Sequence, residues 1–182
     1  VSDAVQTAPE RVYMDLREGY LKLYLADWLD LKLGRQVATW GTGDLLFAND
    51  LFARDWVAFF TGMDLAYLKE PQDLLRIGIY TNGPTLELAL SPYHTADNIP
   101  NGQRLSVYNP FLRELVGADQ TAAVESASRD LKHGELYGRF YGYSGSMEWA
   151  LYGYSGYYPT PLGAKMVDTV PTLYAPQLAS GG

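Results

Sequence analysis

The sequence contains no cysteine, only two histidines and no long apolar run. Without cysteine there is no disulfide, no thiolate metal site and no cysteine nucleophile. His94 and His133 stand about 40 positions apart in expected loops, which excludes a histidine-rich metal site, and we expect each to be a surface histidine. No stretch approaches the roughly 18 to 20 consecutive apolar residues that a membrane-spanning helix needs, so a helical membrane protein is excluded.

Positive charge is also scarce. Lys and Arg number 14 against 21 acidic residues, which gives a net charge of -7, and no basic run is present. Such a chain attracts phosphate backbones weakly, so we expect no nucleic-acid partner. The 182 residues instead include 15 Tyr and 18 Gly, and 47% are hydrophobic, a mixture that suits strands and turns rather than helices or disorder.

Alternating apolar and polar residues predict an all-β, antiparallel up-and-down meander. In each strand one face carries Leu, Ile, Met or Trp, and the other carries charged residues or Tyr. Asn82-Gly83 predicts a type I′ hairpin turn, and Gly34 suggests a bulge. Within residues 1–182, taken as a single unit, the predicted strands are 17–25, 29–40, 74–81, 84–91, 135–143 and 147–158.

The connections between these strands alternate between short and long. Turns are expected at 26–28, 82–83 and 144–146, and long loops at 41–73 and 92–134. Short turns at one end and long loops at the other are the plan of outer-membrane β-barrels, and a soluble sandwich does not require it. In a membrane barrel the apolar face meets lipid, whereas in a soluble barrel it points inward. Alternation alone does not separate the two, and loop asymmetry and tyrosine content favour the membrane barrel.

The polar face of such a barrel would line a water-filled pore. The predicted pore-lining residues are Tyr20, Lys22, Tyr24, Asp30, Lys32, Arg76, Tyr80, Glu87, Arg139, Tyr141, Glu148 and Tyr152. Aromatic residues near strand ends would form interfacial girdles, with ordinary core or turn packing as an equal alternative. These girdle residues are Trp28, Trp40, Tyr80, Tyr157 and Tyr158.

The long loops are expected to hold short helices. Asp50 is predicted to cap a helix with an apolar face, which would constrict the pore or cover its mouth, or else pack on the outer rim. Its predicted residues are Asp50, Leu51, Phe52, Trp56, Phe59 and Phe60. The segment 110–130 is also expected to be helical, because Ala and Glu favour a helix.

Each candidate catalytic or cofactor-binding motif in the sequence lacks a required residue, so we expect neither an enzyme nor a cofactor or metal. Two Gly-Tyr-Ser-Gly copies have Ser146 and Tyr157 where a nucleophile elbow needs glycine. Gly41-Thr42-Gly43 lacks the rest of a phosphate-binding fingerprint. The segment 97–102 vaguely resembles a calcium loop, but Ile99 stands where an oxygen ligand is required.

Residues 16–56 resemble a family of large, mostly uncharacterised outer-membrane porin-like proteins of Gram-negative bacteria. The matching residues are Leu16, Arg17, Glu18, Tyr20, Leu31, Leu33, Gly34, Arg35, Gln36, Trp40, Gly41, Asn49, Asp50 and Leu51. The resemblance implies a barrel of more than six strands, so we expect this chain to be a fragment. An eight-stranded barrel would need further strands at 103–109 and 168–174.

These observations predict a protein of the bacterial outer membrane that contacts the lipid bilayer. The expected function is a porin-like channel for passive or facilitated diffusion of small hydrophilic solutes, with charge selectivity and oligomeric state left open. One alternative is a soluble carbohydrate-binding β-sandwich or barrel that uses its Tyr and Trp rings as sugar platforms. A further alternative is an outer-membrane barrel enzyme, although no nucleophile and base pair is evident.

Overall fold

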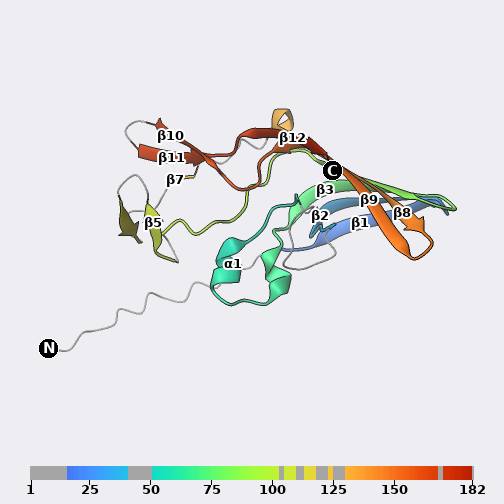
Figure 1. Ribbon diagram of the computed structural model, residues 1–182, viewed down its shortest axis with the longest axis horizontal. Coiled ribbons are helices and arrows are strands. Elements are labelled where there is room, and N and C mark those ends of the chain that lie inside the picture. The colour runs from blue at the N-terminus through green and yellow to red at the C-terminus, as the bar shows by residue number, and fades with distance from the viewer. Residues whose placement is uncertain are drawn as a thin grey trace.

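One open antiparallel sheet dominates the computed structural model (Figure 1). The structure describes residues 16–40, 51–102, 105–109, 113–117, 123–124, 130–167 and 170–181. The sheet has seven strands in the order β1-β2-β3-β4-β8-β9-β12. They are β1 (Gly19–Ala26), β2 (Leu29–Gln36), β3 (Gln72–Tyr80), β4 (Thr85–Ser91), β8 (Glu135–Ser144), β9 (Met147–Tyr157) and β12 (Gln177–Gly181).

The six predicted segments become six successive neighbours in this sheet, each antiparallel to the next. The all-β, antiparallel prediction is therefore confirmed. The second strand ends at Gln36 rather than at position 40, and β12, which was not predicted, pairs with β9. Among the described residues β1 and β12 each pair with one neighbour only, so the sheet is not closed.

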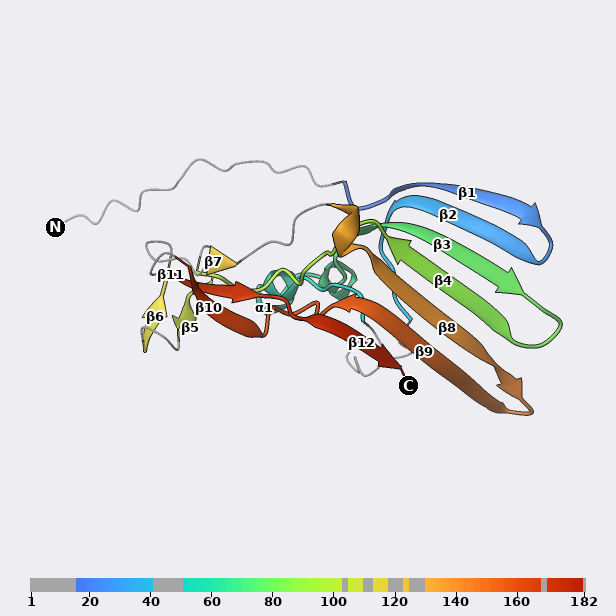
Figure 2. The same cartoon turned by 90° about the horizontal axis from the view of Figure 1, so that it is seen from above.

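All three short turns lie at one end of the sheet, and the long connections lie at the other (Figure 2). The connections hold α1 (Trp56–Phe60), η1 (Leu65–Leu68), η2 (Leu131–His133) and the hairpin of β5 (Val107–Asn109) and β6 (Glu114–Val116). They also hold a small sheet of β10 (Gly163–Val167), β11 (Val170–Tyr174) and β7 (Ala123–Val124). Strands β5 and β11 fall in the segments proposed as extra barrel strands, but they do not join the main sheet.

The turn between β3 and β4 differs from the predicted one. Neither Asn82 nor Gly83 has a positive φ, so a type I′ turn is wrong, and the connection has four residues, Thr81 to Pro84. Pro84 has no N–H to donate and biases Gly83 toward extended backbone. The Thr81 hydroxyl shapes the turn instead, because it accepts from Gly83 N at 3.1 Å and donates to Pro84 O at 2.7 Å.

Gly34 does not mark a bulge, since it pairs in register with Tyr20, and the register shift lies between Tyr24 and Ala26. Gly34 has a φ of +129°, and a Cβ there would lie 2.5 Å from Gly19 O. A side chain at this position would therefore collide with the backbone of β1.

The predicted loop helices are partly wrong. Helix α1 begins after Asp55, whose side chain accepts from Ala58 N, and Leu51 and Phe52 precede it. The expected cap, Asp50, lies outside the described residues. Within 110–130 the described residues form strands β6 and β7 rather than a helix. In the part of the chain that the structure describes, no helix combines the length and apolar character needed to cross a bilayer.

The buried core lies on the polar face of the sheet, at the end where the long loops are. It consists of Ala38, Trp40, Phe52, Leu74, Ala89, Tyr137 and Tyr154. In the sheet, every buried residue that the structure describes lies on this face except Gly142. The leucine-bearing face is left uncovered by every described element.

Candidate functional site

The residues predicted to line a pore all lie on one face of the sheet. The register places Lys22 beside Lys32 and Lys32 beside Arg76. A second row runs across six strands, from β1 to β9, and contains Tyr24, Asp30, Gly78, Glu87, Arg139 and Tyr152. Tyr20, Tyr80, Tyr141 and Glu148 share the parity of these rows and therefore their face.

Oppositely charged side chains on this face form ion pairs across the strands, one between β1 and β2 and three connected pairs from β3 to β9. Lys22 Nζ lies 3.0 Å from Asp30 Oδ2, and Arg76 lies 3.7 Å from Glu87. Arg139 lies 3.9 Å from Glu87 and 3.4 Å from Glu148. The side chains of Asp30, Arg139 and Glu87 are only 13%, 14% and 18% exposed. This face therefore holds charge in a crowded, partly desolvated setting.

Tyrosine rings lie next to the cations of the same face. Lys32 Nζ is 3.7 Å from the centroid of the Tyr20 ring, and the Arg139 guanidinium is 4.0 Å from that of Tyr141. Attraction between a cation and the ring quadrupole orients both side chains. Tyr80 donates its hydroxyl to Asp30 Oδ1 at 3.3 Å. A cavity of about 320 Å³ opens among these groups, over β1 to β4.

The loop before β3 folds onto the polar face through Phe52. This side chain is fully buried, stacks on Tyr137 with ring centroids 4.5 Å apart and meets the edge of Trp40 at 5.1 Å. Two further contacts hold the loop. Arg17 donates to Lys69 O at 2.7 Å, and Trp56 Nε1 donates to Asp97 Oδ2 at 3.0 Å. The loop therefore covers the polar side of the sheet, at the end opposite the turns.

The other predicted loop residues behave differently from Phe52. Leu51 is half-buried and packs against the core, and Trp56 is half-buried against Phe59 and Phe60. Phe59 and Phe60 are themselves exposed. The apolar residues of helix α1 therefore do not pack on the sheet. Phe52, which precedes the helix, makes that contact instead.

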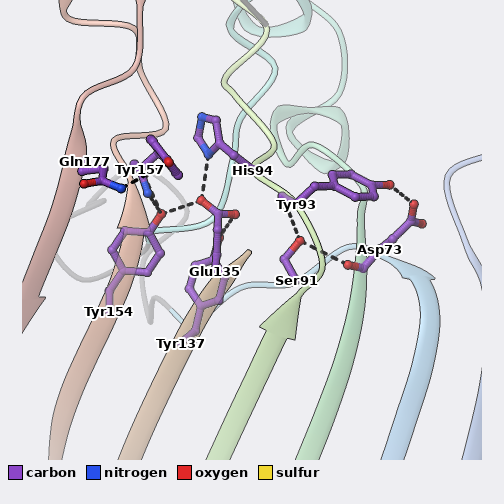
Figure 3. Close-up of polar contacts among 9 residues, drawn as sticks. All are labelled: Asp73, Ser91, Tyr93, His94, Glu135, Tyr137, Tyr154, Tyr157 and Gln177. Atoms are coloured by element: carbon purple, nitrogen blue, oxygen red, sulfur yellow. Dashed lines mark hydrogen bonds and ion pairs between the residues drawn. The ribbon is translucent and has the colours of Figure 1, made fainter. Parts of the chain in front are cut away.

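A buried polar cluster centres on Glu135 at the start of β8 (Figure 3). Its Oε1 accepts from Tyr154 at 2.6 Å and lies 2.7 Å from His94 Nδ1. Its Oε2 accepts from Tyr137 at 2.8 Å. A buried carboxylate is stable only when donors surround it, and these three side chains supply them. They link the loop after β4 to strands β8 and β9.

His94 is buried rather than at the surface, so the expectation for it is wrong. Its Nδ1 faces a carboxylate and so carries the proton in this arrangement, while its Nε2 is buried and has no hydrogen-bond partner among the residues that the structure describes. His133 is half-buried and contacts Asp130. The sequence signal for the Glu135 cluster was the parity that Glu135 shares with Tyr137. Nothing in the sequence placed His94 beside it.

A second group of contacts ties the loop after β4 to β3 (Figure 3). Tyr93 donates its hydroxyl to Asp73, and Ser91 Oγ donates to Tyr93 O at 2.6 Å. Asp73 also faces Arg35 at 3.9 Å. The loop is therefore anchored at its first residues, just before His94.

Two of the predicted girdle residues are placed elsewhere. Trp40 is buried in the core on the polar face, and Tyr157 packs against the rings of His94 and His133. Residues of the loops pack against both side chains, and strand alternation does not predict such contacts. Trp28, Tyr80 and Tyr158 are exposed.

The segment that vaguely resembles a calcium loop has a structural role. The Asp97 carboxylate accepts from Arg54 N at 2.8 Å, Trp56 Nε1 at 3.0 Å and Thr160 Oγ1 at 2.5 Å. Its oxygens are thus engaged by donors that join three separate segments. Among the described residues no group of three or more His, Asp or Glu side chains is arranged to hold a metal.

Comparison with known proteins adds no relative. The chain matches no protein-family model, no curated protein and no solved structure at a significant level. The resemblance over residues 16–56 therefore stays a prediction.

Proposed function

We propose that this chain forms part of the wall of an outer-membrane β-barrel, a porin-like channel through which small hydrophilic solutes diffuse. The observation that carries the proposal is the reversed burial of the two sheet faces. None of the leucines on the apolar face is buried and several, such as Leu23, are exposed, whereas Asp30, Arg139 and Glu87 on the polar face have side chains that are only 13%, 14% and 18% exposed. A soluble protein would reverse this arrangement.

The apolar face is broad and continuous across the strands. One row consists of Leu23, Leu31, Ile77 and Leu88, and the adjacent row of Leu21, Leu33, Leu75, Leu90 and Leu136. None of these side chains is buried, and Leu23 is 44% exposed. Soluble monomers rarely expose contiguous apolar patches beyond a few hundred Å². Hydrocarbon chains would cover this face without any further protein.

Three strands of the sheet have the length that crossing a bilayer requires. Strands β3, β8 and β9 have 9, 10 and 11 residues, whereas β1 and β2 have 8 each, β4 has 7 and β12 has 5. A tilted membrane-spanning strand needs about 9 to 11 residues. Placing the three short turns in the periplasm puts the long loops on the outside, as in outer-membrane barrels.

The loop packed on the polar face acts, in this proposal, as a constriction. Phe52 holds it on the lumen side, at the end of the sheet opposite the turns, where it would occupy part of the cross-section. The resemblance of residues 16–56 to porin-like proteins of Gram-negative bacteria agrees with this assignment. A carbohydrate-binding sandwich would instead need a second sheet over the leucines.

Cysteine labelling tests the proposal, because the native chain has no cysteine that would react. Leu23→Cys and Lys22→Cys place single thiols on opposite faces of β1. In vesicles containing the full-length protein, we expect a charged, water-soluble thiosulfonate to label position 22 and to leave position 23 unlabelled until the protein is unfolded, because a thiol in hydrocarbon does not ionise to the reactive thiolate. Unmodified protein should give stepwise conductance in planar bilayers. A thiol at position 23 that reacts fully with the charged reagent would overturn the proposal.

A further inference from the structure

The cavity on the polar face has one cation more than its carboxylates can neutralise. It is lined by three cationic side chains, those of Lys22, Lys32 and Arg76, and by the carboxylates of Asp30 and Glu87. Tyr20, Ile77, Gly78 and Tyr80 complete the lining.

Both carboxylates in the cavity already have cationic partners. Asp30 pairs with Lys22 at 3.0 Å and also accepts from Tyr80 at 3.3 Å. Glu87 lies between Arg76, at 3.7 Å, and Arg139, at 3.9 Å. Neither acid is therefore left for Lys32.

Lys32 has no ion-pair partner among the described residues. Its ammonium lies 3.7 Å from the centroid of the Tyr20 ring, and Glu18 attracts it without forming an ion pair. The register places it directly between Lys22 and Arg76 on adjacent strands. Like charges opposite one another destabilise a sheet, so a row of three cations has a structural cost that a bound anion would offset.

We propose that this cavity is a binding subsite for a small solute that carries one carboxylate group, held between Lys32 and Arg76. Arg76 offers two parallel N–H donors that match a carboxylate, and one unneutralised lysine matches a single negative charge. Tyr20 and Tyr80 provide a ring and a hydroxyl for the body of the solute. The volume, about 320 Å³, suits a molecule of the size of benzoate. The subsite rests on the proposed function, because the channel provides its water-filled surroundings. It identifies the permeant as a small solute with one carboxylate group.

Equilibrium binding to the full-length protein in detergent micelles tests the subsite without requiring conduction. The probes are benzoate, neutral benzamide and inorganic phosphate, titrated by calorimetry. We expect benzoate to bind more tightly than benzamide or phosphate. Lys32→Gln should weaken benzoate binding about fivefold, the effect of one partly exposed ion pair. Lys32→Arg should retain it, which separates loss of charge from misfolding.

The matched control is Lys132→Gln, which removes the same charge from an exposed position in η2, outside the cavity. It should leave benzoate binding unchanged. Equal binding of benzoate and benzamide, tighter binding of phosphate, or an unchanged affinity in Lys32→Gln would each overturn the subsite. Conductance without benzoate binding would contradict the subsite alone. Benzoate binding that depends on Lys32, together with a water-exposed position 23, would contradict the channel alone.

Discussion

The two faces of the main sheet are made of alternate residues of the same strands, yet they differ in what covers them. Phe52 and Trp40 pack over the polar face, where Tyr137 and Tyr154 are also buried. The apolar face has no such cover among the described residues, and side chains such as Leu23 remain exposed. Alternation thus determines which residues share a face, whereas the loops determine which face is buried.

The glycines show the same contrast in packing. On the polar face, a Cβ added at Gly78 would lie 2.3 Å from Asp30 Oδ1 and 2.7 Å from the Tyr80 hydroxyl. On the apolar face, a Cβ added at Gly153 would meet nothing within 4 Å. The surface around Gly78 is therefore filled by its own side chains and that around Gly153 is open, whereas Gly142, also on the apolar face but close to the turns, would place a Cβ 3.0 Å from Trp149.

The largest expected effect comes from removing the side chain that anchors the loop. Phe52→Ala should reduce the free energy of unfolding by about 3–5 kcal/mol, because it empties a fully buried aromatic site. It should also raise single-channel conductance, since the loop loses its anchor on the lumen side. Phe60→Ala, in the same loop but exposed, should change stability by less than about 0.5 kcal/mol. Urea unfolding and bilayer conductance measure both, and similar effects of the two substitutions would contradict the inward packing.

An arginine placed on each face should show by its effect on stability which face contacts lipid and which contacts water. Leu23→Arg should cost about 2–4 kcal/mol in vesicles, as expected for an arginine that faces lipid near the bilayer midplane. Tyr24→Arg, one residue away on the polar face and 76% exposed, should cost less than about 0.5 kcal/mol. The measurement is reversible urea unfolding in vesicles. If both variants unfold like the native protein, the apolar face does not contact hydrocarbon.

Removing one buried charge should have an intermediate effect. Glu135→Gln replaces an acceptor oxygen with an NH₂ group among donors from Tyr137, Tyr154 and His94, and should cost about 1–3 kcal/mol. Glu148→Gln makes the same change where the side chain is 39% exposed and has one partner, Arg139, so its cost should stay below about 1 kcal/mol. Thermal unfolding compares the two. An equal loss of stability would show that the Glu135 cluster does not hold the loop.

The sequence predicted the strands because their signal is local. Leu75, Ile77 and Ile79 alternate with Arg76, Gly78 and Tyr80, and this pattern alone assigns all six to their faces. The row of pore-facing candidates follows from the same parity, and so does the position of the short turns at one end. What alternation supplies is therefore the sheet and the composition of each face.

The loops could not be predicted in this way, since their contacts join residues far apart in the chain. His94 reaches Glu135 over 41 positions, and Asp97 reaches Thr160 over 63. For Trp40, at the end of a predicted strand, alternation allowed an interfacial girdle or core packing equally, and Phe52 and Tyr137 enclose it in the core. Lys32 was predicted on the polar face, but only the structure shows that no described carboxylate forms an ion pair with it.

The smallest expected effect comes from adding one methyl group to each face. Gly78→Ala should displace Asp30 and Tyr80, whose side-chain ends can shift, so we expect a loss of stability of only about 1 kcal/mol. The same shift moves Asp30 away from Lys22 and narrows the cavity, so benzoate binding should weaken severalfold. Gly153→Ala adds its methyl group where the structure has open space and should leave benzoate binding unchanged. Calorimetric titration with benzoate compares the two variants. Unaltered binding in Gly78→Ala would mean that the carboxylate is not held in this cavity.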